Sequence, residues 1–244
     1  MAKNRPVIYS LLFILLAIGL SALIIALGLF MGEHMRGLKD KEAISSSVRT
    51  TIVIDAGHGG EDGGAVAIDG TLEKDLNLEI ATLICGLLEL NGNDVKMTRA
   101  TDTLLYDYYD DLEDYTGQKK VYDLKNRLKI AQESENSIYV GIHMNKFSQA
   151  KYSGLQVYYS KNNDDSYGIA SKLKSNTRLY LQKDNKREIK GADSSIFILN
   201  KIEAPAILIE CGFLSNENEL NNLKNSDYQA KLALTIFSSL IEGY

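Results

Sequence analysis

The sequence predicts an α/β domain with a mostly parallel sheet, preceded by one transmembrane helix. Two patterns predict the domain: short, nearly continuous apolar runs rich in β-branched residues, and stretches of helical periodicity between them. Runs of the first kind are typical of strands buried on both faces of a parallel sheet. Their alternation with helices predicts βαβ units with right-handed crossovers. A long uncharged stretch near the N-terminus predicts the membrane span.

The first expected element is the transmembrane helix, a signal anchor over residues 7–31. These 25 residues carry no charge, and a helix of that length measures about 37 Å, enough to cross a hydrocarbon core of about 30 Å. Lys3 and Arg5 precede it, which predicts that residues 1–6 are cytoplasmic and that the rest of the chain is extracytoplasmic. A cleaved signal peptide is the main alternative, although no clear cleavage site follows the span.

A linker and then a folded domain are expected after the span. Residues 32–50 mix charges of both signs with a run of serines and show no apolar periodicity, which is typical of a linker. The folded domain is expected over residues 51–244 as a single unit, because neither an internal repeat nor a second linker follows.

Composition excludes some classes of protein. The net charge of −5 argues against a nucleic-acid binder, which needs basic surface. Two cysteines cannot form a disulfide scaffold. For Cys85 and Cys211 we expect two separate buried thiols, with a single bridge between them as the alternative.

Five segments are predicted as strands and four as helices. The central strands are expected at residues 51–55, 137–142 and 206–209, and weaker candidates at 94–98 and 155–160. Apolar periodicity predicts helices at residues 72–90, 121–132, 167–181 and 228–241. Residues 102–118 fit neither pattern, since they hold six acidic residues and four tyrosines. This segment is interpreted as a solvated loop or as a docking surface for an accessory protein.

The three central strands all run into residues that can bind a metal or move a proton. His58 follows the first strand in a glycine-rich turn, His143 follows the second, and Glu210 follows the third. In open α/β sheets, ligands bind outside the carboxyl ends of the strands, so parallel pairing would bring these side chains to one edge. Glycine in the first turn lets the backbone bend tightly and leaves the imidazole accessible.

Two histidines with polar companions favour a metal site over plain hydrogen bonding. Catalytic zinc takes three protein ligands, and two histidines with one glutamate are a known set. Glu73 is the natural third ligand because it begins the helix that follows the His58 turn, although the helix dipole alone also favours an acidic residue there. Glu61 and Asp62 are rival ligands.

Glu210 is expected to have a separate role. Burial at a strand end raises the pKa of a carboxyl group, which suits it to exchange protons with water and with a leaving amine. The alternative is an ion pair with Arg99 or Arg127, because buried carboxylates are usually paired.

Several strings then indicate a family. They lie at residues 54–60 (IDAGHGG), 73–74 (EK), 97–99 (MTR), 142–145 (IHMN) and 209–216 (IECGFLSN). In this order and spacing, the chain from residue 51 to residue 244 resembles the zinc-dependent N-acetylmuramoyl-L-alanine amidases of the type 3 family. Two departures, Gly141 where the family usually has serine and Gln132 where it usually has asparagine, touch no proposed ligand.

The resemblance implies a reaction and the residues that perform it. His58, Glu73 and His143 would hold Zn²⁺, and Glu210 would be the catalytic carboxylate. The reaction would cleave the amide between the lactyl group of N-acetylmuramic acid and L-alanine of the peptidoglycan stem peptide. A sheet of about six strands flanked by helices is also implied. Supporting polar groups are expected at Asn145, Asp55 and Arg99.

The insertion at residues 102–118 and the segment 123–127 resemble the branch of germination-specific spore-cortex amidases. This branch implies a role in forming the muramic lactam of the cortex. The expected partners are peptidoglycan, the membrane through the N-terminal helix, and an accessory protein at the insertion. Two other functions stay open: a non-catalytic wall-binding or regulatory module on the same fold, and a zinc carboxypeptidase acting within the stem peptide.

Overall fold

The structure is a computed structural model that describes residues 50–111 and 114–241, together with residues 19, 27–29 and 31. It divides into two units, Met1–Arg49 and Thr50–Tyr244. The cytoplasmic N-terminus, the signal-anchor helix and the linker that the sequence predicts lie outside the described residues, apart from those few positions. Within the described part of the chain, no helix is both long and apolar enough to cross a bilayer.

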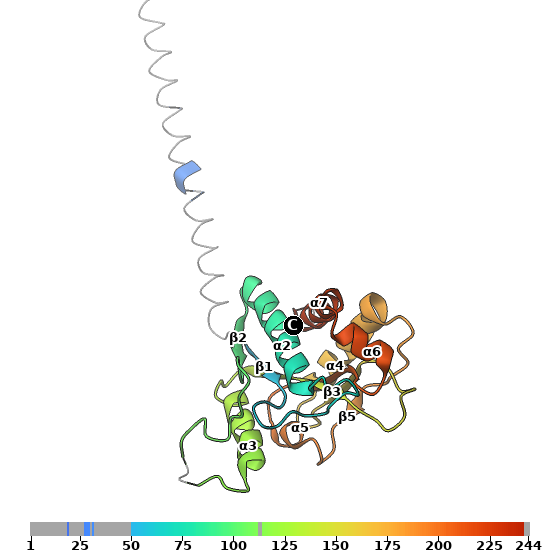
Figure 1. The fold of residues 1–244 in the computed structure, drawn as a ribbon. Helices are drawn as coiled ribbons and strands as arrows, with labels where there is room; N and C mark the ends of the chain where they lie inside the picture. Colours follow the sequence, from blue (N-terminus) through green and yellow to red (C-terminus); the bar gives the residue numbers. More distant parts are fainter. Residues whose placement is uncertain (1–18, 20–26, 30, 32–49, 112–113, 242–244) are drawn as a thin grey trace, which may run out of the picture. The chain divides into compact units, whose positions relative to one another are not determined.

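A mostly parallel sheet forms the centre of the second unit (Figure 1). The described residues form six strands in the order β2-β1-β3-β6-β4-β5. Their bounds are β1 (Thr51–Ala56), β2 (Asp94–Met97), β3 (Ser137–Asn145), β4 (Gln156–Tyr159), β5 (Lys190–Gly191) and β6 (Ala206–Phe213). Only β4 and β6 pair in antiparallel fashion, whereas the other neighbours are parallel. The predicted α/β fold is therefore confirmed.

Two strands extend beyond the apolar runs that predicted them. β3 continues to Asn145 and β6 continues to Phe213, and His143 lies directly opposite Glu210 in the register between them. A shift in register between His143 and Asn145 follows. Both polar side chains therefore belong to paired strands and do not follow them as loop residues, which fixes their separation through the sheet.

Helices cover both faces of the sheet. Their bounds are α2 (Glu73–Leu90), α3 (Lys119–Ala131), α4 (Asp165–Asn176), the π-helical turn η1 (Thr177–Leu181), α5 (Phe197–Lys201), α6 (Glu217–Leu223) and α7 (Ser226–Ile241). The four predicted helices are found at their expected positions, the third as α4 continued by η1. The sequence missed α5, α6 and β5, because elements this short do not complete an apolar repeat.

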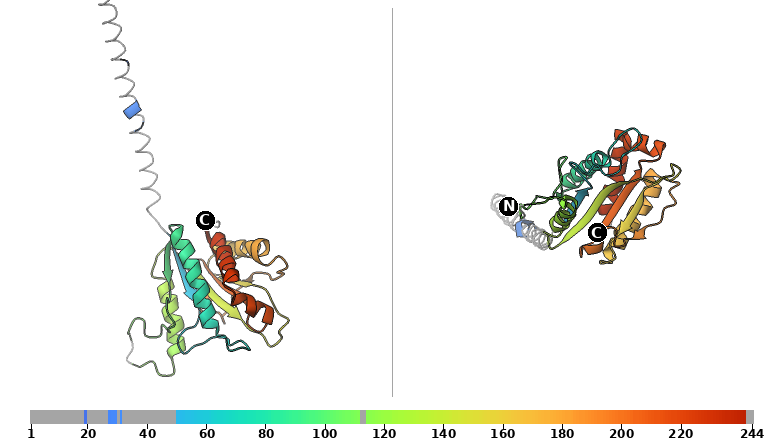
Figure 2. Two further views of the ribbon diagram at one scale, coloured as in Figure 1. Left: turned by 45° about the horizontal axis from the view of Figure 1, so that its top comes forward. Right: turned by 60° about the horizontal axis from the view of Figure 1, so that its bottom comes forward.

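Alternate residues of the strands supply two hydrophobic clusters. Ile54, Ile142 and Ile209 pack in the larger cluster with α2, α4 and α7, and Val53 and Tyr139 pack in the smaller one with α5. The views in Figure 2 show α2 and α7 side by side along one face. The smaller cluster lies on the opposite face, with α3 and α5 over it.

Much of the segment 102–118 packs against α3. Leu105 is buried, its backbone N–H donates to Asp123 Oδ1 at 2.7 Å, and Asn126 donates to its carbonyl. Tyr109 bonds to Glu133, while Tyr108 stays half exposed. The described part of the segment is thus an ordered loop held by α3.

Candidate active site

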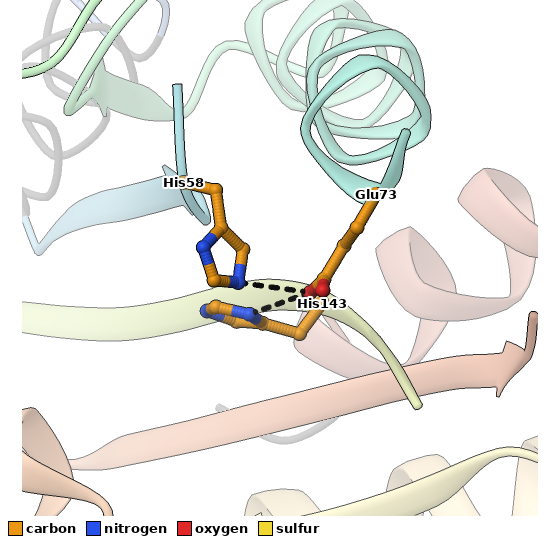
Figure 3. A group of neighbouring side chains, drawn as sticks. All are labelled: His58, Glu73 and His143. Carbon is orange, nitrogen blue, oxygen red and sulfur yellow. Dashed lines mark hydrogen bonds and ion pairs between the residues drawn. The ribbon is translucent and has the colours of Figure 1, made fainter. Parts of the chain in front are cut away.

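Three side chains from three elements meet at the carboxyl ends of β1 and β3. His58 follows β1, Glu73 begins α2, and His143 lies in β3. Glu73 Oε1 lies 3.2 Å from His58 Nε2 and 3.0 Å from His143 Nδ1, and Figure 3 shows the three pointing toward one another. One ligand atom of each lies within 4.8 Å of the others. Ligands of a tetrahedral zinc site lie about 3.4 Å apart, so this cluster fits a single metal ion.

The backbone of His58 is held in an unusual conformation. Its φ of 62° lies in the left-handed region, which is costly for a non-glycine residue. Two buried arginines stabilise the turn from behind. Arg99 donates to the Gly57 carbonyl at 3.0 Å, and Arg127 donates to the His58 carbonyl at 2.6 Å. The turn therefore aims the imidazole at Glu73.

Glycine at two positions lets the cluster close. A Cβ on Gly57 would lie 2.2 Å from the His143 ring. A Cβ on Gly64 would lie 2.7 Å from Glu73 Oε2 and from His58 Cδ2. Gly57 of the predicted turn, and Gly64 beyond it, thus allow a close approach of side chains that any other residue would block.

The Glu73 carboxylate is buried, and both of its oxygens accept hydrogen bonds. It accepts hydrogen bonds from the backbone N–H groups of Ala65 at 2.8 Å and Met144 at 3.0 Å. Burial raises the pKa of Glu73, but its bonds to His143 and His58 lower the pKa by more, so the group is ionised at neutral pH. Burial lowers the pKa of His58, but Glu73 and Asp62 raise it by more.

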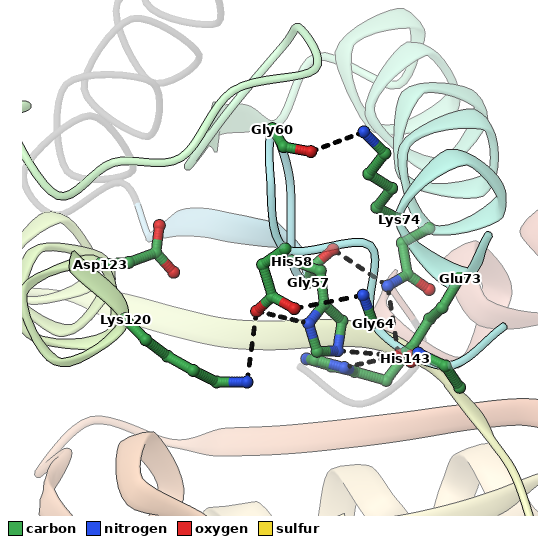
Figure 4. Close-up of polar contacts among 12 residues, drawn as sticks. Gly57, His58, Gly60, Gly64, Glu73, Lys74, Lys120, Asp123 and His143 are labelled. Carbon is green, nitrogen blue, oxygen red and sulfur yellow. Dashed lines mark hydrogen bonds and ion pairs between the residues drawn. The ribbon is translucent and has the colours of Figure 1, made fainter. Parts of the chain in front are cut away.

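Asp62 contacts the other nitrogen of the His58 ring. Its Oδ2 lies 2.9 Å from His58 Nδ1 and 3.4 Å from Lys120 Nζ, and Figure 4 shows Lys120 reaching toward this group. Glu61 pairs instead with Lys119 at 3.1 Å. Among the described residues, neither rival belongs to the metal-ligand cluster. The spacing of the sequence could not separate Asp62 as a ligand from Asp62 as a partner of His58.

Glu210 lies beside the cluster without a partner of its own. Its Oε2 is buried and accepts no hydrogen bond from the described residues. Burial raises the pKa of Glu210 to about 7, although His143 partly opposes this. The alternative ion pair was wrong, because Arg127 pairs with Asp55 and Asp123, and Arg99 donates to backbone carbonyls. Both arginines are already satisfied around the β1 turn.

Of the supporting residues, Asp55 lies behind the cluster. It is 1% exposed and bonds to Arg127, Thr98 and Tyr139. The Asn145 carbonyl accepts the N–H of Leu214 and so ties the end of β3 to the end of β6. Asp55, Asn145 and Arg99 thus all hold backbone or other side chains near the cluster.

A cleft of about 240 Å³ opens on the cluster and Glu210 between α3 and α5. His58, His143 and Glu210 line one side. The apolar part of the lining consists of Leu124, Ile196, Phe197, Ile198 and Leu208. An apolar wall beside polar groups can exclude water while it orients a substrate. The sequence missed the part of this lining that α5 and the residue before it supply, since α5 was not predicted.

The two cysteines take no part in this site. Both are free and buried, so the expectation of separate thiols is confirmed and the single bridge is not formed. Burial raises the pKa of the Cys85 thiol to about 12 and raises that of Cys211 as well, so neither is a reactive thiolate.

Fold and site together define a class of protein. A mostly parallel sheet whose strand ends hold two imidazoles, an ionised carboxylate and a second, protonatable carboxylate is the arrangement of a hydrolase that has an α/β fold and a candidate metal site. Residues 52–242 match the N-acetylmuramoyl-L-alanine amidase family. The chain belongs to this family, whose members hydrolyse the amide that joins the stem peptide to muramic acid.

Known proteins resemble the chain over the same domain. It is 34% identical over 195 residues to the germination-specific N-acetylmuramoyl-L-alanine amidase of Bacillus subtilis, covering 79% of each chain. It is 39% identical, with a TM-score of 0.74, to the CwlD amidase of Clostridioides difficile, solved in complex with the GerS lipoprotein; the match covers 80% of this chain and 98% of that one. The catalytic domain of CwlV from Bacillus (Paenibacillus) polymyxa matches with 28% identity, a TM-score of 0.64, and coverage of 79% and 97%.

Proposed function

We propose that this amidase depends on zinc, that His58, Glu73 and His143 hold the metal, and that Glu210 moves the protons of the reaction. The observation that carries the proposal is a juxtaposition on β3 and β6. A cluster with metal-ligand spacing lies beside Glu210, whose buried Oε2 has no hydrogen-bond partner among the described residues. Two imidazoles and one carboxylate are a donor set that zinc takes in hydrolytic enzymes, with a further position left for water or substrate.

A bound zinc supplies Lewis-acid polarisation of the scissile carbonyl and makes water a better nucleophile at neutral pH. The residues of the chain supply the rest. Glu210, with a pKa of about 7, can accept the proton of the attacking water and then donate it to the departing L-alanine nitrogen. Asp62 accepts from His58 Nδ1 and so keeps Nε2 directed at the cluster. The apolar wall of the cleft limits competing water.

The other two functions are supported less well. A non-catalytic wall-binding module has no need of a carboxylate oxygen that is buried without a hydrogen-bond partner, since such an atom costs stability. A carboxypeptidase acts on a different bond from the one that defines this family.

The test uses the full chain and defined muropeptides, with and without added zinc. The expected products are free peptides that begin with L-alanine. Glu210→Gln is expected to retain about one zinc per chain and to lose activity by about 10²–10⁴-fold, the contribution of general acid–base catalysis. Glu89→Gln, an exposed change at the far end of α2, is the control. Wild-type hydrolysis by Glu210→Gln, or products shortened from the peptide's C-terminus, would contradict the proposal.

We also propose that residues 7–31 anchor the chain in the membrane, that the domain faces the cell wall, and that the enzyme acts on spore cortex. The uncharged stretch and the similarity to a germination-specific amidase support this. Protease added to intact cells should then remove the domain, and spores without the protein should lack muramic lactam. Protection of the domain from protease would argue against its position outside the membrane. Normal lactam content in the spores would argue against a role in the cortex.

For the segment 102–118, we propose that it docks an accessory protein. The packing of its described residues on α3 and the exposed ring of Tyr108 support a docking surface, and a similar amidase was solved with a lipoprotein bound. Tyr108→Ala should weaken binding of the organism's corresponding lipoprotein in a pull-down. Unchanged binding in this variant, with unchanged activity, would remove the segment from the interface.

A further inference from the structure

A second and larger hollow lies near the start of β4 and the end of β6. It has a volume of about 670 Å³ and is lined by residues 151–154, residues 181–187, Glu219, Asn222 and Tyr228. We call it the cationic hollow. None of its lining residues belongs to the metal-ligand cluster or to the cleft between α3 and α5.

The charges around this hollow are mostly positive, although the whole chain has a net charge of −5. Its lining includes four cations, Lys151, Lys183, Lys186 and Arg187, and two carboxylates, Asp184 and Glu219. Glu219 is already occupied, because it accepts the N–H groups of Gly154 at 2.7 Å and Phe213 at 2.8 Å. Within the described part of the chain, Lys183 and Lys186 are exposed and pair with no acidic residue. The hollow therefore offers free positive charge to a ligand.

Arg187 is held in place at the edge of the hollow. Its guanidinium lies 4.4 Å from the centre of the Phe213 ring, and its Nε donates to the Ser153 carbonyl at 2.7 Å. The Tyr152 ring stacks on Phe213 at 6.4 Å between centres. A cation fixed in this way loses little freedom when it binds an anion, so this position is suited to recognition.

Strands β4 and β6 connect the cationic hollow to the edge of the sheet that holds Glu210. Gln156 in β4 lies opposite Glu210 in β6, and its side-chain oxygen is 3.4 Å from Arg187 Nη1. Phe213, which contacts Arg187, follows Glu210 in the same strand. Glu210, which lines the cleft between α3 and α5, is therefore paired in the sheet with a residue that contacts Arg187 of the hollow.

The two halves of the amidase substrate also differ in charge, as the hollow and the cleft do. The carboxyl group of muramic acid is consumed in the scissile amide, so the lactyl and N-acetylated sugar half carries no charge. The peptide half carries at least its C-terminal carboxylate. In the cleft, by contrast, Lys120 contacts Asp62 and Arg127 pairs with Asp55, which leaves little free positive charge there.

We propose that the cationic hollow binds the carboxylates of the stem peptide, and that the cleft between α3 and α5 takes the uncharged lactyl-sugar half. The proposal rests on the amidase function described above. It assigns a direction to the substrate, with the peptide running over β4 toward Lys183, Lys186 and Arg187.

The test compares two soluble muropeptides, one with free stem carboxylates and one with those carboxylates converted to amides. In the full chain, Lys183→Ala/Lys186→Ala should raise KM for the free form about tenfold and change kcat less than about twofold. KM for the amidated form should be high in the wild type and unchanged in the variant. The control variant Lys125→Ala/Lys231→Ala removes two exposed lysines outside the hollow. It should leave KM unchanged for both substrates. Binding of both muropeptides to the Glu210→Gln variant, with and without the lysine changes, gives Kd without turnover.

An unchanged KM and Kd for the free form, or an equal loss for both forms, would overturn the proposal. The muropeptides carry none of the anionic phosphate polymer of intact cell walls. If the lysine variant loses activity only on intact walls, the lysines bind that polymer, and the proposal is overturned as well. If the wild type cleaves neither muropeptide, the proposed amidase function is wrong instead. The comparison of Kd values then still shows whether the hollow binds carboxylates.

Discussion

At the scale of single residues, the orientation of His58 depends on the carboxylate behind it. Asp62 Oδ2 lies 2.9 Å from His58 Nδ1, while Nε2 faces Glu73. An acceptor at Nδ1 places the proton there and leaves Nε2 free to bind a metal. Asp62 was a rival ligand on sequence spacing, yet its contact is with the imidazole nitrogen that points away from Glu73.

Asp62→Asn should therefore lower zinc affinity by about 10–100-fold, the usual effect of losing a carboxylate that orients a histidine ligand. Competition with a chelator measures this, and the circular dichroism spectrum should stay unchanged. Glu61→Gln, which alters the exposed neighbour that pairs with Lys119, should keep wild-type affinity. Equal affinities for Asp62→Asn and the wild type would show that Asp62 does not position the ring.

At the scale of elements, the turn after β1 and the helix α2 use glycine for different reasons. Gly57 lies against the His143 ring, and an added Cβ would approach it to 2.2 Å. Gly86 lies within α2, where an added Cβ would meet nothing within 4 Å. The first glycine allows β1 and β3 to present their histidines together, whereas the second only weakens a helix.

These two glycines predict opposite results for the same substitution. Gly86→Ala should stabilise the domain by about 0.5–1 kcal/mol, since alanine favours a helix, with zinc affinity unchanged. Gly57→Ala should displace His143 and lower zinc affinity and activity by at least about tenfold, the scale of disturbing a metal site's surroundings. Urea unfolding and chelator competition measure both effects. Tight zinc binding by Gly57→Ala would mean that the histidines tolerate a wider spacing.

At the scale of the whole domain, one buried network joins β1, α3 and β3. Arg127 from α3 pairs with Asp55 from β1 and with Asp123, and Tyr139 from β3 donates to Asp55. Burial raises the pKa of Asp55, but Arg127 and the hydrogen bonds from Thr98 and Tyr139 lower it by more. The folded state therefore binds the Asp55 proton more weakly than the unfolded chain does.

Stability from Asp55 is fully present above its unfolded pKa of about 3.9 and is lost as the pH falls through its lower pKa in the folded state. Urea unfolding should therefore show the domain weakening below about pH 4. Asp55→Asn should cost about 3 kcal/mol at pH 7, since Arg127 loses one buried partner, and the fall at acid pH should become shallower. An equal dependence on pH in both proteins would show that other carboxylates cause the acid loss.

The sequence alone determined the α/β class, five of the strands, four helical segments and the meeting of His58, His143 and Glu210 at one edge, whereas Glu73 joined this set only through the resemblance to a family. Apolar periodicity is a local property, and parallel strands bring their carboxyl ends together whatever the loops between them. Only the tertiary structure decided that Glu210 lacks a partner, that Arg127 belongs to Asp55, and that Asp62 contacts the far nitrogen of His58. It alone also assembled the cationic hollow from distant segments. Such contacts depend on strand register and on short elements such as α6, which leave no repeating pattern in the chain.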